Sequence, residues 1–346
     1  MKIRRVDRLR RAIRQLRNGY EGVILLYHRV AELPLDPHLL GVTPQHFAEH
    51  LEIFRKHGHP MRLQQLIQAL HDGNLPHRAV VVTFDDGYAD NLYNAMPLLE
   101  RYGIPATVFV PTGYIGHERE LWWDELDRVL LQPGTLPETL RLKINGSPCQ
   151  WELGEGAHYG EDDYRRHRCW NVKEKGNPGP RQRLYRSLHQ LLGPLPEGEQ
   201  RKVLDELLAW AGAESMGRPT HRTLTAEELT KLAEGGLVEL GAHTMTHPVL
   251  SVLPVEAQRA EIQGSKARLE EILGCPVTSF AYPYGERSHY TAETLAIVRE
   301  TGFACACSAF ADFVWQGTKR FELPRVFVRD WDGDELARRL RAFFSA

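Results

Sequence analysis

The residues best suited to chemistry stand together at two places in the sequence. Asp85 and Asp86 follow an apolar, β-branched run that begins at Val80 and is typical of a buried strand. Because neighbouring side chains on a strand point to opposite sides, we expect the two carboxylates to have different tasks. One can bind a cation while the other acts as a base. Gly87 then allows the chain to turn sharply away from the strand.

A strand that ends in Asp-Gly is by itself more often a plain turn. The second place, far downstream, favours a site instead: His243 and His247 are four residues apart. In a helical turn this spacing puts two imidazoles on one face, within reach of one ion. Two imidazoles and one carboxylate form a facial set of ligands that leaves positions open for water and substrate.

His28 is a third candidate. It ends another apolar run, at residues 22–30, that also reads as a buried strand. A lone histidine at a strand end is usually structural. If this strand and the one before Asp85 are parallel neighbours, however, their ends open on the same face of the sheet. We therefore treat His28 as a candidate for acid–base catalysis.

The alternation of strands and helices along the chain predicts an α/β fold. Seven or eight strands alternate with helices, which favours a distorted (β/α) barrel over an open sheet. The alternation stops after the third strand, where we expect an insertion or lid at the active-site face. The expected organisation is a basic amphipathic helix at 1–21, a barrel at 22–332 interrupted by the insertion at 115–222, and a C-terminal helix at 333–346.

Composition sets limits on partners and location. The 346 residues carry a formal net charge of −2, which gives no reason to expect a nucleic-acid partner. Residues 2–17 read as a basic amphipathic helix that either packs on the domain or contacts an anionic membrane surface. No apolar run approaches the roughly 20 residues that span a bilayer, and no signal-peptide pattern is evident. We expect a cytoplasmic protein, peripheral to the inner face of the membrane if the helix binds lipid.

Three motifs, in this order, resemble the polysaccharide deacetylases of the NodB-homology type, carbohydrate esterase family 4. They are Thr-Phe-Asp-Asp-Gly at 83–87, His-Thr-Met-Thr-His at 243–247 and Pro-Tyr-Gly at 283–285. The resemblance covers roughly residues 22–114 and 223–332. It implies that Asp85 is the catalytic base. It also implies that Asp86, His243 and His247 bind a divalent cation, usually zinc, with cobalt, nickel or manganese as alternatives.

The third motif and the general acid follow from the same resemblance. The backbone N–H of Tyr284, next to Pro283, is expected to bind the oxyanion. The family's late Leu-x-His motif, which supplies the acid, has no match after residue 290, but Leu26-Tyr27-His28 matches it near the start of the chain. This arrangement resembles circularly permuted members, such as the deacetylases of biofilm poly-N-acetylglucosamine. We therefore assign the acid role to His28.

The sequence departs from the family pattern at one position. The third motif usually begins with an arginine that pairs with the base, and Ala281 stands there instead. Arg325 and Arg29 are the candidates to replace it. Asp330, followed by Trp331, resembles the family's Asp-Trp motif and is a candidate for orienting His28.

The expected function is that of a metal-dependent hydrolase. It would remove an N-acetyl group from an N-acetylated sugar in a polysaccharide, a glycan or a lipid-linked intermediate. A deformylase or O-deacetylase is an alternative, because metal chemistry does not identify the acyl group. A second alternative is an inactive carbohydrate-binding protein. Ala281 argues for this alternative, and the retained Asp85 argues against it.

Overall fold

The structure is a computed structural model that describes residues 22–344. The helix predicted for residues 2–17, and with it the predicted membrane contact, lies outside the described residues. Within 22–344, no helix combines the length and the apolar character needed to cross a bilayer. The cytoplasmic location stays a prediction from the sequence.

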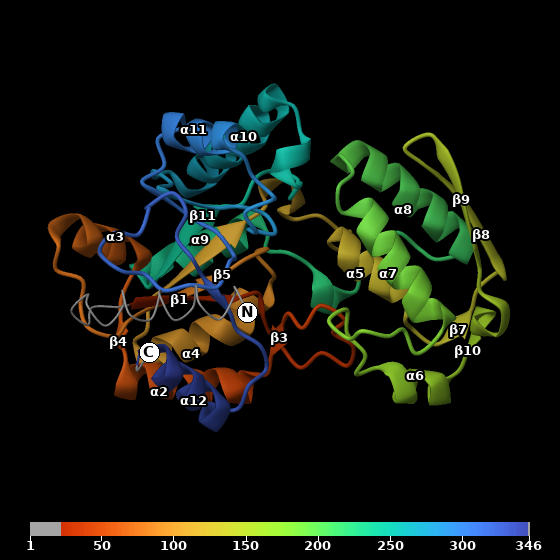
Figure 1. Cartoon of the computed structure of the whole chain (residues 1–346), viewed down its shortest axis with the longest axis horizontal. Coiled ribbons are helices and arrows are strands. Elements are labelled where there is room, and N and C mark those ends of the chain that lie inside the picture. Colours follow the sequence, from red (N-terminus) through yellow and green to blue (C-terminus); the bar gives the residue numbers. More distant parts are fainter. Residues whose placement is uncertain (1–21, 345–346) are drawn as a thin grey trace, which may run out of the picture.

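A curled sheet of eight parallel strands forms the centre of the described fold (Figure 1). Seven strands lie in the order β13-β12-β11-β6-β5-β1-β14, and the short β4 pairs with β5. An isolated bridge joins Cys307 in β13 to Leu323, which precedes β14, and the curled sheet forms a half-barrel. The predicted α/β barrel class is confirmed. The strands are β1 (Gly22–Tyr27), β4 (His59–Pro60), β5 (Ala79–Phe84), β6 (Ala106–Val110), β11 (Val238–Ala242), β12 (Ser279–Ala281), β13 (Cys305–Cys307) and β14 (Val326–Phe327).

Helices cover the sheet, so the long strands are mostly apolar. Every residue of β1 and β5 is buried, as expected for parallel strands with both faces covered. The helices packed around the sheet are α2 (Pro44–His57), α3 (Leu63–Asp72), α4 (Met96–Tyr102), α9 (Ala226–Ala233), α10 (Val255–Leu273), α11 (Ala292–Glu300) and α12 (Gly333–Phe344). Two helix starts have side-chain caps of a kind that the sequence alone indicates: Thr43 caps α2, and Thr225 forms a capping box with Glu228 at α9.

The register of the strands brings the candidate residues to one edge of the sheet. Tyr27 pairs with Phe84, and the backbone N–H of Asp85 donates to the carbonyl of Tyr27 at 3.0 Å. His28 and Asp85 therefore leave the sheet side by side. Two strands away, at the end of β11, the backbone N–H of His243 donates to the carbonyl of Val110 on β6 at 3.1 Å.

The insertion, defined here as residues 115–222, forms a lobe beside the sheet (Figure 1). Three of its helices share a hydrophobic core that includes Leu126, Leu188 and Leu204, all buried. Its elements are α5 (Trp122–Leu130), α6 (Glu161–His167), α7 (Pro180–Leu192), α8 (Glu197–Ala211), β7 (Gly134–Thr135), β8 (Thr139–Ile144), β9 (Ser147–Glu152) and β10 (His158–Tyr159). Two short strands outside it, β2 (Arg29–Val30) and β3 (Gly41–Val42), pair with each other after β1.

Candidate active site

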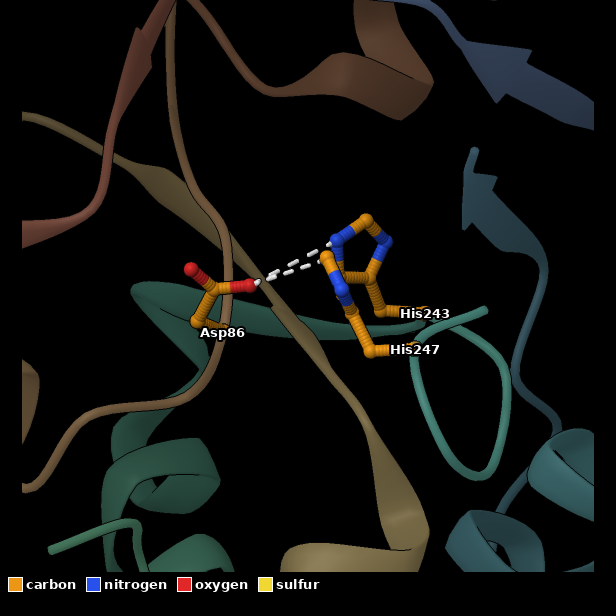
Figure 2. A group of neighbouring side chains, drawn as sticks. All are labelled: Asp86, His243 and His247. Atoms are coloured by element: carbon orange, nitrogen blue, oxygen red, sulfur yellow. Dashed lines mark ion pairs between the residues drawn. The ribbon is translucent and has the colours of Figure 1, made fainter. Parts of the chain in front are cut away.

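Asp86, His243 and His247 converge where β5 and β11 end (Figure 2). Oδ1 of Asp86 lies 3.4 Å from Nε2 of His247 and 3.7 Å from Nε2 of His243. All three side chains are buried, and their ligand atoms lie within 4.8 Å of one another. Among the described residues, Oδ1 of Asp86 has no hydrogen-bond partner. A buried carboxylate oxygen that faces two imidazole nitrogens suits a divalent cation, so these residues fit the expected metal.

The histidine motif lies on a loop, and the predicted helical turn is wrong. Thr244 and His247 have φ values of 64° and 58°, in the left-handed region that an α-helix does not contain. The hydroxyl of Thr244 accepts the backbone N–H of His247 at 3.1 Å. The carboxylate of Glu261 on α10 accepts the backbone N–H groups of Met245 and Thr246, both at 2.8 Å. Side-chain acceptors therefore shape this loop in place of helical hydrogen bonds.

The orientation of His243 is set by a backbone carbonyl. Its Nδ1 lies 2.8 Å from the carbonyl oxygen of Ala281, at the end of β12. A histidine that donates from one ring nitrogen to such an acceptor presents the other nitrogen to a metal. The Nε2 atom of His243 is thereby directed toward Asp86.

Asp85 is held by Arg325, and its Oδ2 also lies 3.8 Å from Nε2 of His243. The pair is bidentate, with both N–O distances at 2.7 Å, and the guanidinium also donates from Nε to the carbonyl of Ser308 at 2.7 Å. Burial alone would raise the pKa of Asp85, but the charges of Arg325 and then His243 outweigh it and lower the pKa to about 2. Arg325 thus occupies the role left open at Ala281.

Arg29 is not the partner of Asp85. Its Nε donates to Oδ2 of Asp90 at 2.9 Å, and its guanidinium lies over the ring of Tyr88, 4.4 Å from the centroid. Of the two arginines proposed from the sequence, only Arg325 reaches the expected base.

His28 lies beside the metal ligands. Its Nε2 is 3.9 Å from Oδ2 of Asp86, and its ring packs on Phe327 with centroids 5.0 Å apart. Burial lowers the pKa of His28 to about 4; Asp85 opposes this shift, and Arg325 adds to it. At neutral pH the imidazole is therefore uncharged in this arrangement.

The prediction that Asp330 orients His28 is wrong. Its carboxylate accepts the backbone N–H of Thr43 at 2.9 Å and pairs with Nδ1 of His46 at 2.7 Å. The side chain is 43% exposed. Because β14 ends at Phe327, the chain has already left the site when it reaches Asp330, which instead holds the start of α2.

Tyr284 and Pro283 lie next to the metal ligands. The ring of Tyr284 contacts that of His247, with centroids 4.8 Å apart. Tyr284 has a φ of 59°, an unusual conformation for a bulky residue, and Gly285 donates to the carbonyl of Pro283 at 2.6 Å. Such strained turns cluster at functional sites. The oxyanion role of the Tyr284 backbone N–H stays a prediction.

One network at the site was not identified from the sequence. Nε1 of Trp123 donates to the hydroxyl of Tyr88 at 2.9 Å, and that hydroxyl donates to Oδ2 of Asp124 at 2.7 Å. The ring of Trp123 contacts that of His247, with centroids 5.0 Å apart. The insertion therefore contributes a wall of the site. No spacing in the sequence signals this contact, because it depends on how the insertion folds back.

Comparisons with known proteins agree with this geometry. A family model described as polysaccharide deacetylase matches residues 72–134 and 209–306. YxkH of Bacillus subtilis is 29% identical over 139 residues, which are 39% of this chain and 48% of YxkH. A poly-beta-1,6-N-acetyl-D-glucosamine N-deacetylase of Staphylococcus epidermidis is 36% identical over 108 residues, which are 28% of this chain and 37% of that protein. The matches thus span about half or less of these relatives' lengths.

Two solved structures share the fold over nearly the whole chain. IcaB from Ammonifex degensii has a TM-score of 0.58 and 20% identity, covering 95% of this chain and 98% of IcaB. PplD, a deacetylase from Streptococcus pyogenes solved with acetate, has a TM-score of 0.57 and 16% identity, covering 93% of this chain and 98% of PplD. The matched parts of the chain carry all three motifs, and the shared fold agrees with that match: the chain is related to the polysaccharide deacetylases of the NodB-homology type.

Proposed function

We propose that this chain is a metal-dependent hydrolase that removes the N-acetyl group from an N-acetylated sugar of a polysaccharide or glycan. The observation that carries the proposal is the convergence of Asp86, His243 and His247 beside an aspartate held by a buried arginine. The relatives named as poly-beta-1,6-N-acetyl-D-glucosamine N-deacetylases support N-acetylglucosamine polymers as the first substrate class to test.

Zinc is the cation that we propose for the triad of Asp86, His243 and His247, because two imidazoles and one carboxylate suit it. Cobalt, nickel and manganese are the alternatives. When bound, a divalent cation polarises the acetyl carbonyl and makes water more acidic. The carbonyl of Ala281 keeps His243 in the orientation that this binding requires.

Asp85 is proposed to take a proton from the attacking water. With a pKa of about 2, its carboxylate is ionised at every pH near neutrality and ready to accept. Arg325 fixes both carboxylate oxygens, so the acceptor does not rotate away. The same low pKa makes protonated Asp85 a strong acid that readily passes the proton on.

His28 is proposed to deliver that proton to the leaving nitrogen. It begins uncharged, because its pKa is about 4, and protonated Asp85 is acidic enough to charge it. The water oxygen bonds to the acetyl carbon, the C–N bond breaks, and the nitrogen takes the proton from His28. The products are acetate and a free amine. The backbone N–H of Tyr284 is proposed to stabilise the oxyanion that forms between these steps.

The experiment measures all products of three acylated substrates. Zinc-loaded protein is incubated with N-acetylated β-1,6-glucosamine oligomers, their N-formylated analogues and O-acetylated sugars. We expect equal amounts of acetate and free amine from the first substrate. Formate released faster than acetate would favour a deformylase, and acetate without amine an O-deacetylase. Binding of the oligomers without any product would favour a carbohydrate-binding protein.

A further inference from the structure

A second group of ligating side chains lies close to the site already described. Carboxylate oxygens of Asp124 and Asp127 and a ring nitrogen of His221 lie within 4.8 Å of one another, and all three residues are buried. The two aspartates are one turn apart on α5, at the start of the insertion. His221 lies in the 3₁₀ turn Pro219–His221, at the end of the insertion. The group therefore joins both ends of the insertion.

These side chains line a small cavity. Its volume is about 10 Å³, and Arg29, His38 and Trp123 are also among the lining residues. A space of this size holds about one water-sized sphere. It suits a single ion and is too small for a sugar.

The charges around the cavity leave one aspartate without a cationic partner. Arg29 pairs with Asp90 at 2.9 Å, and Arg218 pairs with Glu120 at 2.8 Å and with Asp127 at 2.9 Å. Asp124 has no ion pair among residues 22–344. Its Oδ2 accepts from the Tyr88 hydroxyl.

Asp127 has one oxygen in an ion pair. Within the described residues, its buried Oδ1 lies 2.9 Å from Nη2 of Arg218 and makes no aligned hydrogen bond. Asp127 itself is 3% exposed. Buried carboxylates are costly unless they are paired or coordinate a metal.

We propose that Asp124, Asp127 and His221 form a second divalent-cation site that ties the two ends of the insertion together. Two carboxylate oxygens and one imidazole nitrogen suit a borderline cation such as Zn²⁺ or Mn²⁺. The cation balances the charge of Asp124 and closes a long loop, so its role is structural. This inference does not depend on the deacetylase activity, and its tests use metal binding and stability alone.

The first test is the metal stoichiometry. Wild type, His247→Ala, His221→Gln and the double variant are dialysed against Zn²⁺ or Mn²⁺, and bound metal is measured. We expect two equivalents of at least one of these metals in wild type, one in each single variant and none in the double variant. His71→Ala is the control, because His71 forms an exposed pair with Asp72; it should match wild type. The proposal is overturned if wild type binds one equivalent of metal and His247→Ala binds none. It is also overturned if His221→Gln binds as much metal as wild type.

The second test separates metal binding from folding defects. In the His247→Ala background, the cation is expected to raise the melting temperature, because a ligand of the folded state stabilises it. Adding Asp127→Asn, which keeps the side-chain shape, should abolish this rise while circular dichroism without metal stays unchanged. The proposal is overturned if the cation does not raise the melting temperature of His247→Ala. It is also overturned if the rise survives Asp127→Asn.

Discussion

At the scale of single residues, Arg325 separates the tasks of two adjacent carboxylates. It occupies both oxygens of Asp85, while Asp86 faces the imidazoles of His243 and His247. Burial, together with the charge of Asp85, raises the pKa of Asp86 well above its usual value. A cation stabilises the ionised carboxylate that burial disfavours, so metal and proton compete for Asp86. Bound metal should therefore be released as the pH falls.

The first prediction concerns the pair itself. Arg325→Met leaves the carboxylate of Asp85 buried without a partner, and we expect the free energy of unfolding to fall by about 3–5 kcal/mol. Urea denaturation at pH 7 measures this change. Arg268→Met is the control, because Arg268 and Glu271 form an exposed pair that contributes about 1 kcal/mol or less. An equal effect of both substitutions would contradict the importance of the Arg325 pair.

The stabilisation by Arg325 also has a predicted pH dependence. The folded-state pKa of Asp85, about 2, lies below its unfolded value. The pair therefore contributes fully above the unfolded pKa of about 4, and its contribution disappears as the pH falls toward 2. The difference in unfolding free energy between wild type and Arg325→Met should shrink over this window. A difference that stays constant from pH 5 to pH 2 would contradict this assignment.

The second prediction concerns the protonation state of His28. Since its pKa is about 4, the imidazole enters the reaction uncharged between pH 5 and 8. Titration of His28 should therefore not lower the kcat/KM of metal-saturated protein between pH 5 and 8. The pH profiles of wild type and His28→Gln provide the measurement. A fall in wild type with a midpoint near 6.5, absent in His28→Gln, would show that His28 must begin protonated.

At the scale of the elements, the sequence predicted strands better than loops. Apolar runs identified β1 and β5, because buried parallel strands require them. The helix starts at Thr43 and Thr225 are equally predictable from the sequence, because capping depends on residues close in sequence. The conformation of the loop between His243 and His247 could not be predicted from the sequence, because an i, i+4 spacing fits both a helix and this loop. Its shape depends on Glu261, which comes from another element.

The third prediction follows from that contact. Glu261→Ala removes the acceptor of two backbone N–H groups in the histidine loop, so the loop no longer holds both imidazoles in place. We expect the metal affinity of the triad to fall about 10- to 100-fold. Competition with a chelator measures it, in a His221→Gln background that leaves only the triad. Glu256→Gln, on the exposed face of the same helix, should keep the affinity. Unchanged affinity in Glu261→Ala would rule out this role for Glu261.

At the scale of the whole molecule, the lobe of the insertion lies beside the half-barrel (Figure 1), and its Trp123 contacts His247 of the site. The sequence indicated the insertion as a break in the βα alternation. It did not indicate that Trp123 would reach His247, because that contact joins segments far apart in sequence. The sequence also led to a wrong prediction for Asp330, which lies at the start of α2 and away from His28. Membership of the circularly permuted subgroup stays a prediction, based on His28.

The fourth prediction concerns the core of the insertion. Leu204 on α8 is 2% exposed and packs in the core shared by α5 and α7. Leu204→Ala should lower the free energy of unfolding by about 2–5 kcal/mol, because it leaves a cavity that the core fills only partly. Thermal or urea unfolding provides the measurement. Leu191→Ala, at a position 37% exposed on α7, should cost much less. Similar costs for the two substitutions would contradict a packed core in the insertion.

The most direct test of the account is acetate release by Asp85→Asn and His28→Gln, with the metal content of each protein measured in parallel. The substrate is the one that wild type turns over best. Each variant should lose about 10²- to 10⁴-fold in rate while retaining its metal, because each removes one proton-transfer group. Asp330→Asn should retain the wild-type rate, because Asp330 lies at the start of α2. A wild-type rate in either Asp85→Asn or His28→Gln would contradict the proton path proposed for this site.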